Sequence, residues 1–217
     1  MTQSLARPAT DHQREARSTA FQCVRDDAAL RLDADRCLRL RSRYSDCDQC
    51  ARACPPRVLH VSQERIELTD GCLRCGQCSA ACPTEALQME GFPGDPPRAL
   101  AIETPLHVDC WKVAAYDSPR DALRVPCLGG IALHHLVSWH AACEGRPVVL
   151  LDRGWCGQCS AGNGANHPAQ EVLDTARVLL AELGVAEAAL PRLESLPLPR
   201  TRMPAEIPDP LAAQPLS

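Results

Sequence analysis

The sequence predicts a two-part α+β fold, and two features of the chain point to it. Cys47, Cys50 and Cys54 in the first half lie 28 positions before three further cysteines, as expected of a duplicated module. The second half alternates strand-like and helix-like segments, an order that favours a small α/β unit. The segment 91–97 contains three prolines and two glycines, so we expect a turn-rich linker between the halves.

The composition indicates bound metal rather than disulfides. The chain has 217 residues, 14 of them cysteine, and a formal net charge of −4. Residues 1–20 carry several charges and no apolar run, so neither a secretory signal nor a membrane span is predicted. We therefore expect a cytoplasmic protein whose cysteines ligate metal. With a single lysine and no basic cluster, the chain gives no indication of nucleic-acid binding.

The second copy of the repeat has the pattern C-x2-C-x2-C-x3-C-P. Its ligand candidates are Cys72, Cys75, Cys78 and Cys82, followed by Pro83. Three thiolates on one tight loop can each reach a separate iron of a cubane cluster, and the fourth, before proline, ligates the other cluster. A zinc ribbon fits less well, because zinc sites usually pair two C-x2-C groups at a longer separation.

The first copy departs from this pattern at one ligand. It supplies Cys47, Cys50 and Cys54, but the position that matches Cys72 is Tyr44, which cannot ligate in the usual way. We expect Cys37 to replace it, because a longer loop between the first two ligands costs little closure entropy. Cys23 as the ligand, or a three-iron cluster lacking that ligand, remains the alternative.

Exchange of the fourth cysteines between the copies predicts two sets of ligands. One 4Fe–4S cluster is expected on Cys37, Cys47, Cys50 and Cys82, and the other on Cys72, Cys75, Cys78 and Cys54. Residues 58–61 and 66–68, between the copies, are expected to form a hairpin. The pattern from Cys37 to Glu90 resembles the bacterial-type two-cluster ferredoxin family. The resemblance implies a two-cubane ferredoxin-like domain at 35–92, after an N-terminal extension at 1–34 and before a linker at 93–105.

The second half contains another group of cysteines. Strands are expected at 123–126 and 148–151, and helices at 132–142 and 168–183. One cysteine, Cys127, follows the first strand, and Cys156 and Cys159 follow the second. Parallel strands end at the same edge of a sheet, so these thiols should converge, with Cys110 joining them from the preceding loop. Cys143, at the end of a helix, is expected to be a small buried hydrophobic residue.

These cysteines stand in a recognisable context. The segments are Cys110-Trp111, Pro126-Cys127-Leu-Gly-Gly130 and Gly154-Trp-Cys156-Gly-Gln-Cys159-Ser-Ala-Gly-Asn163. They resemble the delta subunit of methyl-viologen-reducing hydrogenase, a family found with heterodisulfide reductases and flavoproteins. The resemblance covers 106–184 and implies a small α/β domain with a 2Fe–2S cluster on Cys110, Cys127, Cys156 and Cys159. Zinc remains open, since it also accepts four thiolates. The Pro- and Leu-rich residues 185–217 are expected to form an extended tail.

No catalytic constellation accompanies the cysteines. No dinucleotide fingerprint is present, and His134, His135 and His140 are expected to be surface or core residues. Trp111 and Trp155 are expected either to shield a cluster from water or to pack in the core.

The sequence therefore predicts a non-catalytic electron-transfer subunit. The resemblances imply a relay between a low-potential oxidoreductase and a flavoprotein, with a hydrogenase, a heterodisulfide-reductase-type protein or another dehydrogenase as partner. The alternative is a scaffold or assembly factor with a structural zinc site in its C-terminal domain.

Overall fold

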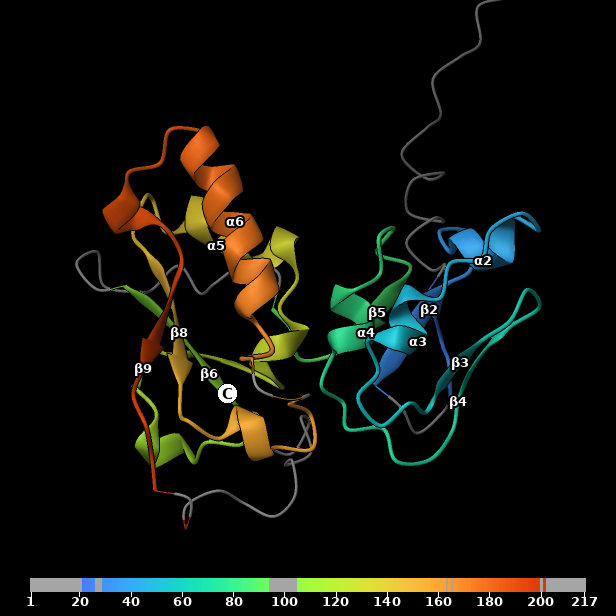
Figure 1. Cartoon of the computed structure of the whole chain (residues 1–217), viewed down its shortest axis with the longest axis horizontal. Coiled ribbons are helices and arrows are strands. Elements are labelled where there is room, and N and C mark those ends of the chain that lie inside the picture. Colours follow the sequence, from blue (N-terminus) through green and yellow to red (C-terminus); the bar gives the residue numbers. More distant parts are fainter. Residues whose placement is uncertain are drawn as a thin grey trace, which may run out of the picture.

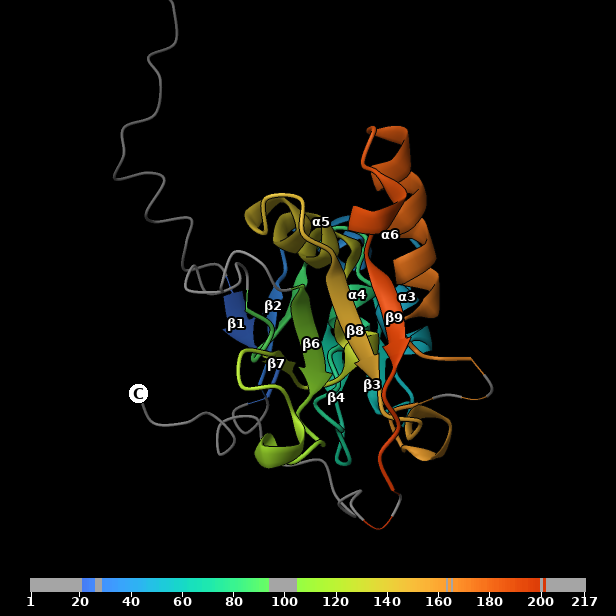
Figure 2. The same cartoon turned by 90° about the vertical axis from the view of Figure 1, so that its left-hand side faces the viewer.

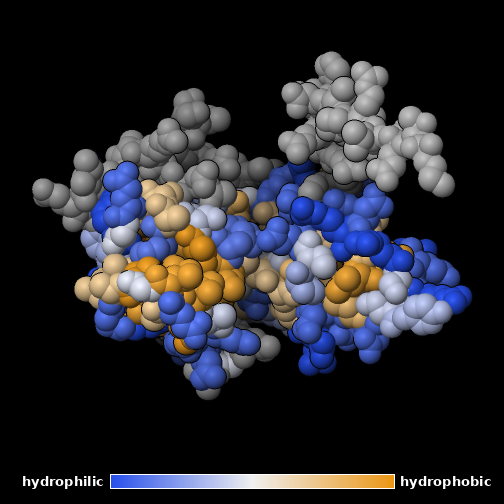
Figure 3. All heavy atoms as spheres, turned by 90° about the horizontal axis from the view of Figure 1, so that it is seen from above, coloured by the Kyte–Doolittle hydropathy of each residue, from blue (hydrophilic) through white to orange (hydrophobic). Residues whose placement is uncertain are grey.

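The computed structural model describes residues 21–25, 29–93, 105–162, 164, 166–199 and 201. Figure 1 shows two lobes side by side. We call residues 21–93 the N-terminal lobe and residues 105–199 the C-terminal lobe. Seen from above, each lobe presents a hydrophobic patch with hydrophilic residues around it (Figure 3). Among the described helices, none combines the length and the apolar character needed to cross a membrane.

The N-terminal lobe is built from very short elements. Its strands form a three-stranded antiparallel sheet, in the order β1-β2-β5, and a separate hairpin of β3 and β4. The predicted hairpin forms, with Val61 opposite Ile66. The bounds are β1 Phe21–Cys23, β2 Leu30–Asp33, α2 Leu38–Arg41, α3 Gln49–Arg52, β3 Leu59–Val61, β4 Ile66–Leu68, α4 Gln77–Ala80 and β5 Leu87–Met89.

The predicted boundary of the N-terminal extension at residue 34 is corrected by the structure. Strand β2 lies inside that range, yet it pairs with β5, with Leu32 opposite Leu87. Leu30 is fully buried in the core of the lobe. A four-residue strand is too short to give a clear alternation of apolar and polar residues, so the sequence did not predict it. Residues 1–20 and 26–28 lie outside the described part of the chain.

The C-terminal lobe is a four-stranded parallel sheet in the order β7-β6-β8-β9 (Figure 2). Helices α5 and α6 pack against each other and against β8 and β9, and Leu136, Trp139, Leu173 and Ala176 fill the core. Cys143 is buried in that core, as predicted. The bounds are β6 Leu106–Cys110, β7 Leu123–Val125, α5 Leu133–Ala142, β8 Val148–Asp152, α6 Gln170–Glu182 and β9 Arg192–Ser195.

Part of the predicted tail belongs to this sheet, which is a second correction. Strand β9 pairs in parallel with β8, with Leu193 opposite Leu150, and Leu190 just before it is 2% exposed. Beyond β9, the backbone N–H of Leu196 donates to the carbonyl of Asp152 at 2.8 Å. An edge strand of four residues between prolines, two of them charged, has no strand signature in sequence. Residues 202–217 of the predicted tail lie outside the described residues.

The two lobes meet where α4 faces the turn η3 Leu128–Gly130. The side-chain amide of Gln77 on α4 donates to the carbonyl of Ala161. His134 Nδ1 lies 3.3 Å from Glu85 Oε1 of the N-terminal lobe. A Cβ on Gly130 would lie 2.2 Å from the carbonyl oxygen of Cys75, so the two backbones approach each other as closely as glycine allows.

A buried ion pair joins three segments of the C-terminal lobe. Arg153 donates to Asp109 through Nη2–Oδ2 at 2.6 Å and Nε–Oδ1 at 3.3 Å, and both side chains are buried. Ser118 Oγ donates to Asp109 Oδ2 at 2.8 Å, and Arg153 Nη1 donates to the carbonyl of Leu196 at 3.3 Å. The pair therefore fixes the ends of β6 and β8 and the segment after β9 at the same edge of the sheet.

Replacing Asp109 with Asn should strongly destabilise the C-terminal lobe. The change leaves the Arg153 charge buried without a carboxylate, which costs about 3–5 kcal/mol. The matched control is Glu187→Gln, because Glu187 pairs with Arg177 while its own side chain is 78% exposed, and such pairs are worth about 0–1 kcal/mol. Guanidinium denaturation followed by circular dichroism measures both; equal losses would show that the buried pair does not hold the lobe together.

Candidate metal centres

The first set of cysteines lines one cavity of the N-terminal lobe. Cys37, Cys47, Cys50 and Cys82 surround it together with Val61, Ile66 and Leu87. Burial, followed by the neighbouring thiols of Cys82, Cys37 and Cys47, raises the pKa of Cys50 to about 12. The sulfur of Cys82 accepts the backbone N–H of Ala86 at 3.3 Å. The four thiols thus come together from the residue before α2, from α3 and the segment before it, and from the segment after α4.

The second set lies beside the first. Burial, followed by the thiols of Cys75, Cys72 and Cys54, raises the pKa of Cys78. Burial also raises the pKa of Cys75 to about 11, and Cys72 and Cys54 act in the same direction. The fourth cysteines are exchanged in space: Cys54, from the first copy, lies with the second set, and Cys82 lies with the first. Because α3 packs against α4, the two sets are neighbours.

The structure distinguishes between Cys37 and Cys23 as candidates for the missing ligand of the first set. Cys37 is buried and immediately precedes α2, and its thiol is one of those that act on Cys50. Cys23 is exposed on β1. Tyr44, at the position of the missing ligand, is 82% exposed. Of the two cysteines considered as replacements, Cys37 is the one that lines the cavity.

The third set lies at one edge of the parallel sheet. Cys110, Cys127, Cys156 and Cys159 line a single cavity of the C-terminal lobe. Strands β6, β7 and β8 run parallel, and their carboxyl ends lead into these cysteines. Cys110 is the last residue of β6 rather than part of a preceding loop, because β6 is a central strand that the sequence did not reveal.

Burial dominates the electrostatics of this third set. It raises the pKa of Cys110 to about 11 and that of Cys156 to about 12, and it raises the pKa of Cys127 well above its usual value. The neighbouring thiols act in the same direction on all three groups. At neutral pH the thiols of Cys110, Cys127 and Cys156 would therefore be protonated without metal, and binding of a metal would release protons, because thiolates are the ligands.

Two polar side chains at this cavity were missed by sequence reasoning. Lys112 is 5% exposed, and its ammonium donates to Cys159 Sγ at 3.7 Å. Its backbone N–H donates to Cys110 Sγ at 3.4 Å. His167 Nε2 lies 3.5 Å from Cys156 Sγ. Lys112 is the only lysine and lies two residues after Cys110, so its position in the sequence could have pointed to the site. The sequence around His167 gives no such indication.

His167 also belongs to an alternative metal site. The ligand atoms of Asp152, Cys156 and His167 all lie within 4.8 Å of one another. However, His167 Nδ1 accepts the backbone N–H of Ala169 at 3.2 Å. A neutral ring bound in this way carries its proton on Nε2, which faces the Cys156 sulfur. This geometry favours His167 as a hydrogen-bond donor to the sulfur over His167 as a ligand.

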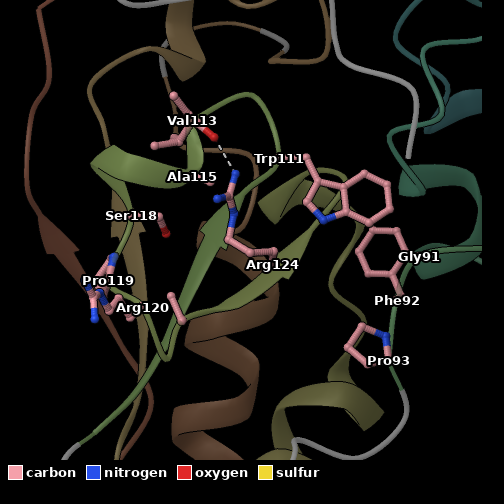
Figure 4. A pocket seen from close by; sticks show the side chains of 12 residues that line it. Gly91, Phe92, Pro93, Trp111, Val113, Ala115, Ser118, Pro119, Arg120 and Arg124 are labelled. Carbon is pink, nitrogen blue, oxygen red and sulfur yellow. Dashed lines mark hydrogen bonds between the residues drawn. The ribbon is translucent and has the colours of Figure 1, made fainter. Parts of the chain in front are cut away.

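Trp111 and Trp155 line different cavities. Trp155 lines the cavity of the third set, and its Nε1 donates to the carbonyl of Leu198 at 2.9 Å. Trp111 lines a different cavity of about 730 Å³, across from Ser118 and Arg120 and next to Phe92 (Figure 4). Trp155 is therefore the tryptophan that can exclude water from the third set.

The donor chemistry of all three sets fits iron–sulfur clusters. Each set offers four cysteine sulfurs, the ligand number of a 4Fe–4S or a 2Fe–2S cluster. Backbone N–H groups donate to Cys82 and to Cys110, as is typical of cluster ligands whose sulfur charge must be stabilised. The third set, by ligand type alone, also fits zinc.

The family described as the 4Fe-4S binding domain matches residues 68–88, which contain Cys72, Cys75, Cys78 and Cys82. No curated protein and no solved structure matches the chain. The chain thus contains a ferredoxin-type domain that binds a 4Fe–4S cluster. With that domain it has an iron–sulfur electron-transfer role.

Replacing Cys37 with Ser should impair a cluster on the first set. Serine offers a poorer ligand at the same place, so we expect a three-iron species or an oxygen-labile cluster, seen as a lower iron content and a changed EPR spectrum. The matched control, Cys23→Ser, should leave both unchanged, because Cys23 is exposed and away from the cavity. The reverse result would make Cys23 the ligand.

Proposed function

We propose that this protein is an electron relay with three iron–sulfur clusters. In this proposal two 4Fe–4S clusters occupy the first and second sets of cysteines and a 2Fe–2S cluster occupies the third. The observation that carries the proposal is the gathering of twelve buried or half-buried cysteines into three sets of four, two in one lobe and one in the other. When bound, such clusters supply one-electron redox chemistry.

The surroundings of the third set favour a redox centre over structural zinc. Lys112 and His167 direct donors at the sulfurs of Cys159 and Cys156, and Trp155 covers the cavity. Hydrogen bonds to sulfur and exclusion of solvent are the means by which proteins adjust cluster potentials.

The residues of the chain supply ligation, spacing and docking surfaces rather than bond-making chemistry. A relay must then exchange electrons with other proteins. The resemblances of the sequence favour a flavoprotein at the C-terminal lobe and a low-potential oxidoreductase, such as a hydrogenase or another dehydrogenase, at the N-terminal lobe. The second candidate is a scaffold or assembly factor, favoured if the third set holds zinc.

The metal content of the anaerobically purified protein tests the proposal. Two cubanes and one 2Fe–2S cluster require about ten irons per chain, whereas the scaffold alternative requires about eight irons and one zinc. Cys110→Ser should remove the third cluster and leave both cubanes, seen by iron analysis and EPR.

The matched control for this experiment is His167→Ala. In a site of four thiols, His167 only donates to a sulfur, so its removal should retain the metal. Loss of the metal in His167→Ala, with retention in Cys110→Ser, would assign the site to Asp152, Cys156 and His167 and would contradict the proposal.

Replacing Lys112 with Met should lower the reduction potential of the third cluster. Reduction adds negative charge beside the Cys159 sulfur, and the buried ammonium stabilises that added charge. Methionine keeps the length of the side chain and removes the charge. Redox titration monitored by EPR measures the shift, and the potentials of the two cubanes serve as internal controls. An unchanged potential would show that Lys112 does not interact with the third cluster.

A further inference from the structure

The second set of cysteines contacts both of the others. Within the N-terminal lobe, Cys50 of the first set lies in the same buried hydrophobic cluster as Cys54 and Cys78 of the second. Across the lobe interface, Cys75 of the second set lies in one buried cluster with Cys127 of the third. The second set thus occupies the middle of the molecule.

The contact between the second and third sets is closely packed. Cys75, Cys127 and Ala161 form a small buried cluster, with Leu73 and Cys159 packed against it. Side chains from both lobes therefore exclude water between the two sets. Gln77, two residues after Cys75, bridges the same interface by donating to the carbonyl of Ala161.

Glycine at position 130 makes this approach possible. A Cβ at Gly130 would lie 2.2 Å from the carbonyl oxygen of Cys75 and 2.3 Å from the ring of Phe92. Separations under 3 Å from backbone atoms are not relieved by a side-chain movement, so any larger residue would push α4 away from the turn that follows Cys127. The distance between Cys75 and Cys127 depends on the absence of a side chain at Gly130.

We propose that the three sets form a linear path, in which electrons cross between the lobes at Cys75 and Cys127 and Gly130 is the residue that sets their distance. The inference rests on the proposed function. In the step between the lobes, one electron leaves the reduced centre on the second set, which is oxidised, and reduces the centre on the third set, or the reverse. No bond forms or breaks, and the external reductant is a low-potential donor such as dithionite or the partner protein.

The spin coupling between the reduced centres of the full-length protein tests this inference, because such coupling falls steeply with distance. In the dithionite-reduced wild type we expect the EPR signals of the second and third centres to be broadened by each other. Gly130→Val should retain the iron content of all three centres but lose that broadening. It should also slow electron transfer between the lobes after rapid-mixing reduction.

The matched control is Gly157→Ala, between two ligands of the third set. A Cβ at Gly157 would meet its nearest neighbour at 3.8 Å, an ordinary contact, so this variant should keep the coupling. If Gly130→Val retains its iron and its coupling, the inference is overturned.

Gln77→Ala gives a second, milder test, should Gly130→Val fail to fold. It removes the bridge to Ala161 without adding volume, so weakened coupling supports the inference and unchanged coupling overturns it. A failure of the proposed function can be told apart from a failure of this inference. In the first case, the wild-type protein would contain zinc and would lack the EPR signal of the third centre.

Discussion

The packing of the N-terminal lobe is organised around its buried cysteines. Its helices have four residues each and its strands three or four, lengths at which neither element is stable alone in water. Five of its buried residues, Cys37, Cys50, Cys54, Cys75 and Cys78, are ligand candidates. In such a lobe, the free energy of metal binding contributes directly to the free energy of folding. The conformation of the chain around α3 and α4 therefore brings the thiols toward common centres.

The C-terminal lobe positions its cysteines by a different kind of packing. Its parallel sheet and two helices form a conventional core, so the cysteines are placed at the edge of the sheet rather than at its centre. The Asp109–Arg153 pair fixes the end of β6, where Cys110 lies, to the end of β8, which leads into Cys156. The hydrophobic core of the lobe, rather than metal ligation, therefore positions the third set. We expect this lobe to keep more of its structure without metal than the N-terminal lobe does.

Cysteine spacing predicted much of the arrangement of the sets, because ligands on one loop must reach one centre. Spacing pointed to Cys37, and the rule that parallel strands end at one edge brought together Cys127, Cys156 and Cys159. Strands β2 and β9 were not predicted, since each has four residues and is defined by its pairing partner rather than by its own pattern. Lys112 and His167 were missed because their role depends on a fold that brings distant segments to the same sulfurs. The docking of the two lobes, with Gly130 against Cys75, has no local signature at all.

The isolation of Lys112 has a practical chemical consequence. All other fixed positive charge in the side chains belongs to arginine, so the chain contains one ε-amine, and that amine is buried against the Cys159 sulfur. Acylating reagents modify amines and leave guanidinium groups largely untouched. Among the side chains, such reagents would find a single amine, which becomes accessible only when the cavity opens. Mass-spectrometric detection of acylation at Lys112 would thus report, without interference from other lysines, how often that cavity is exposed to solvent.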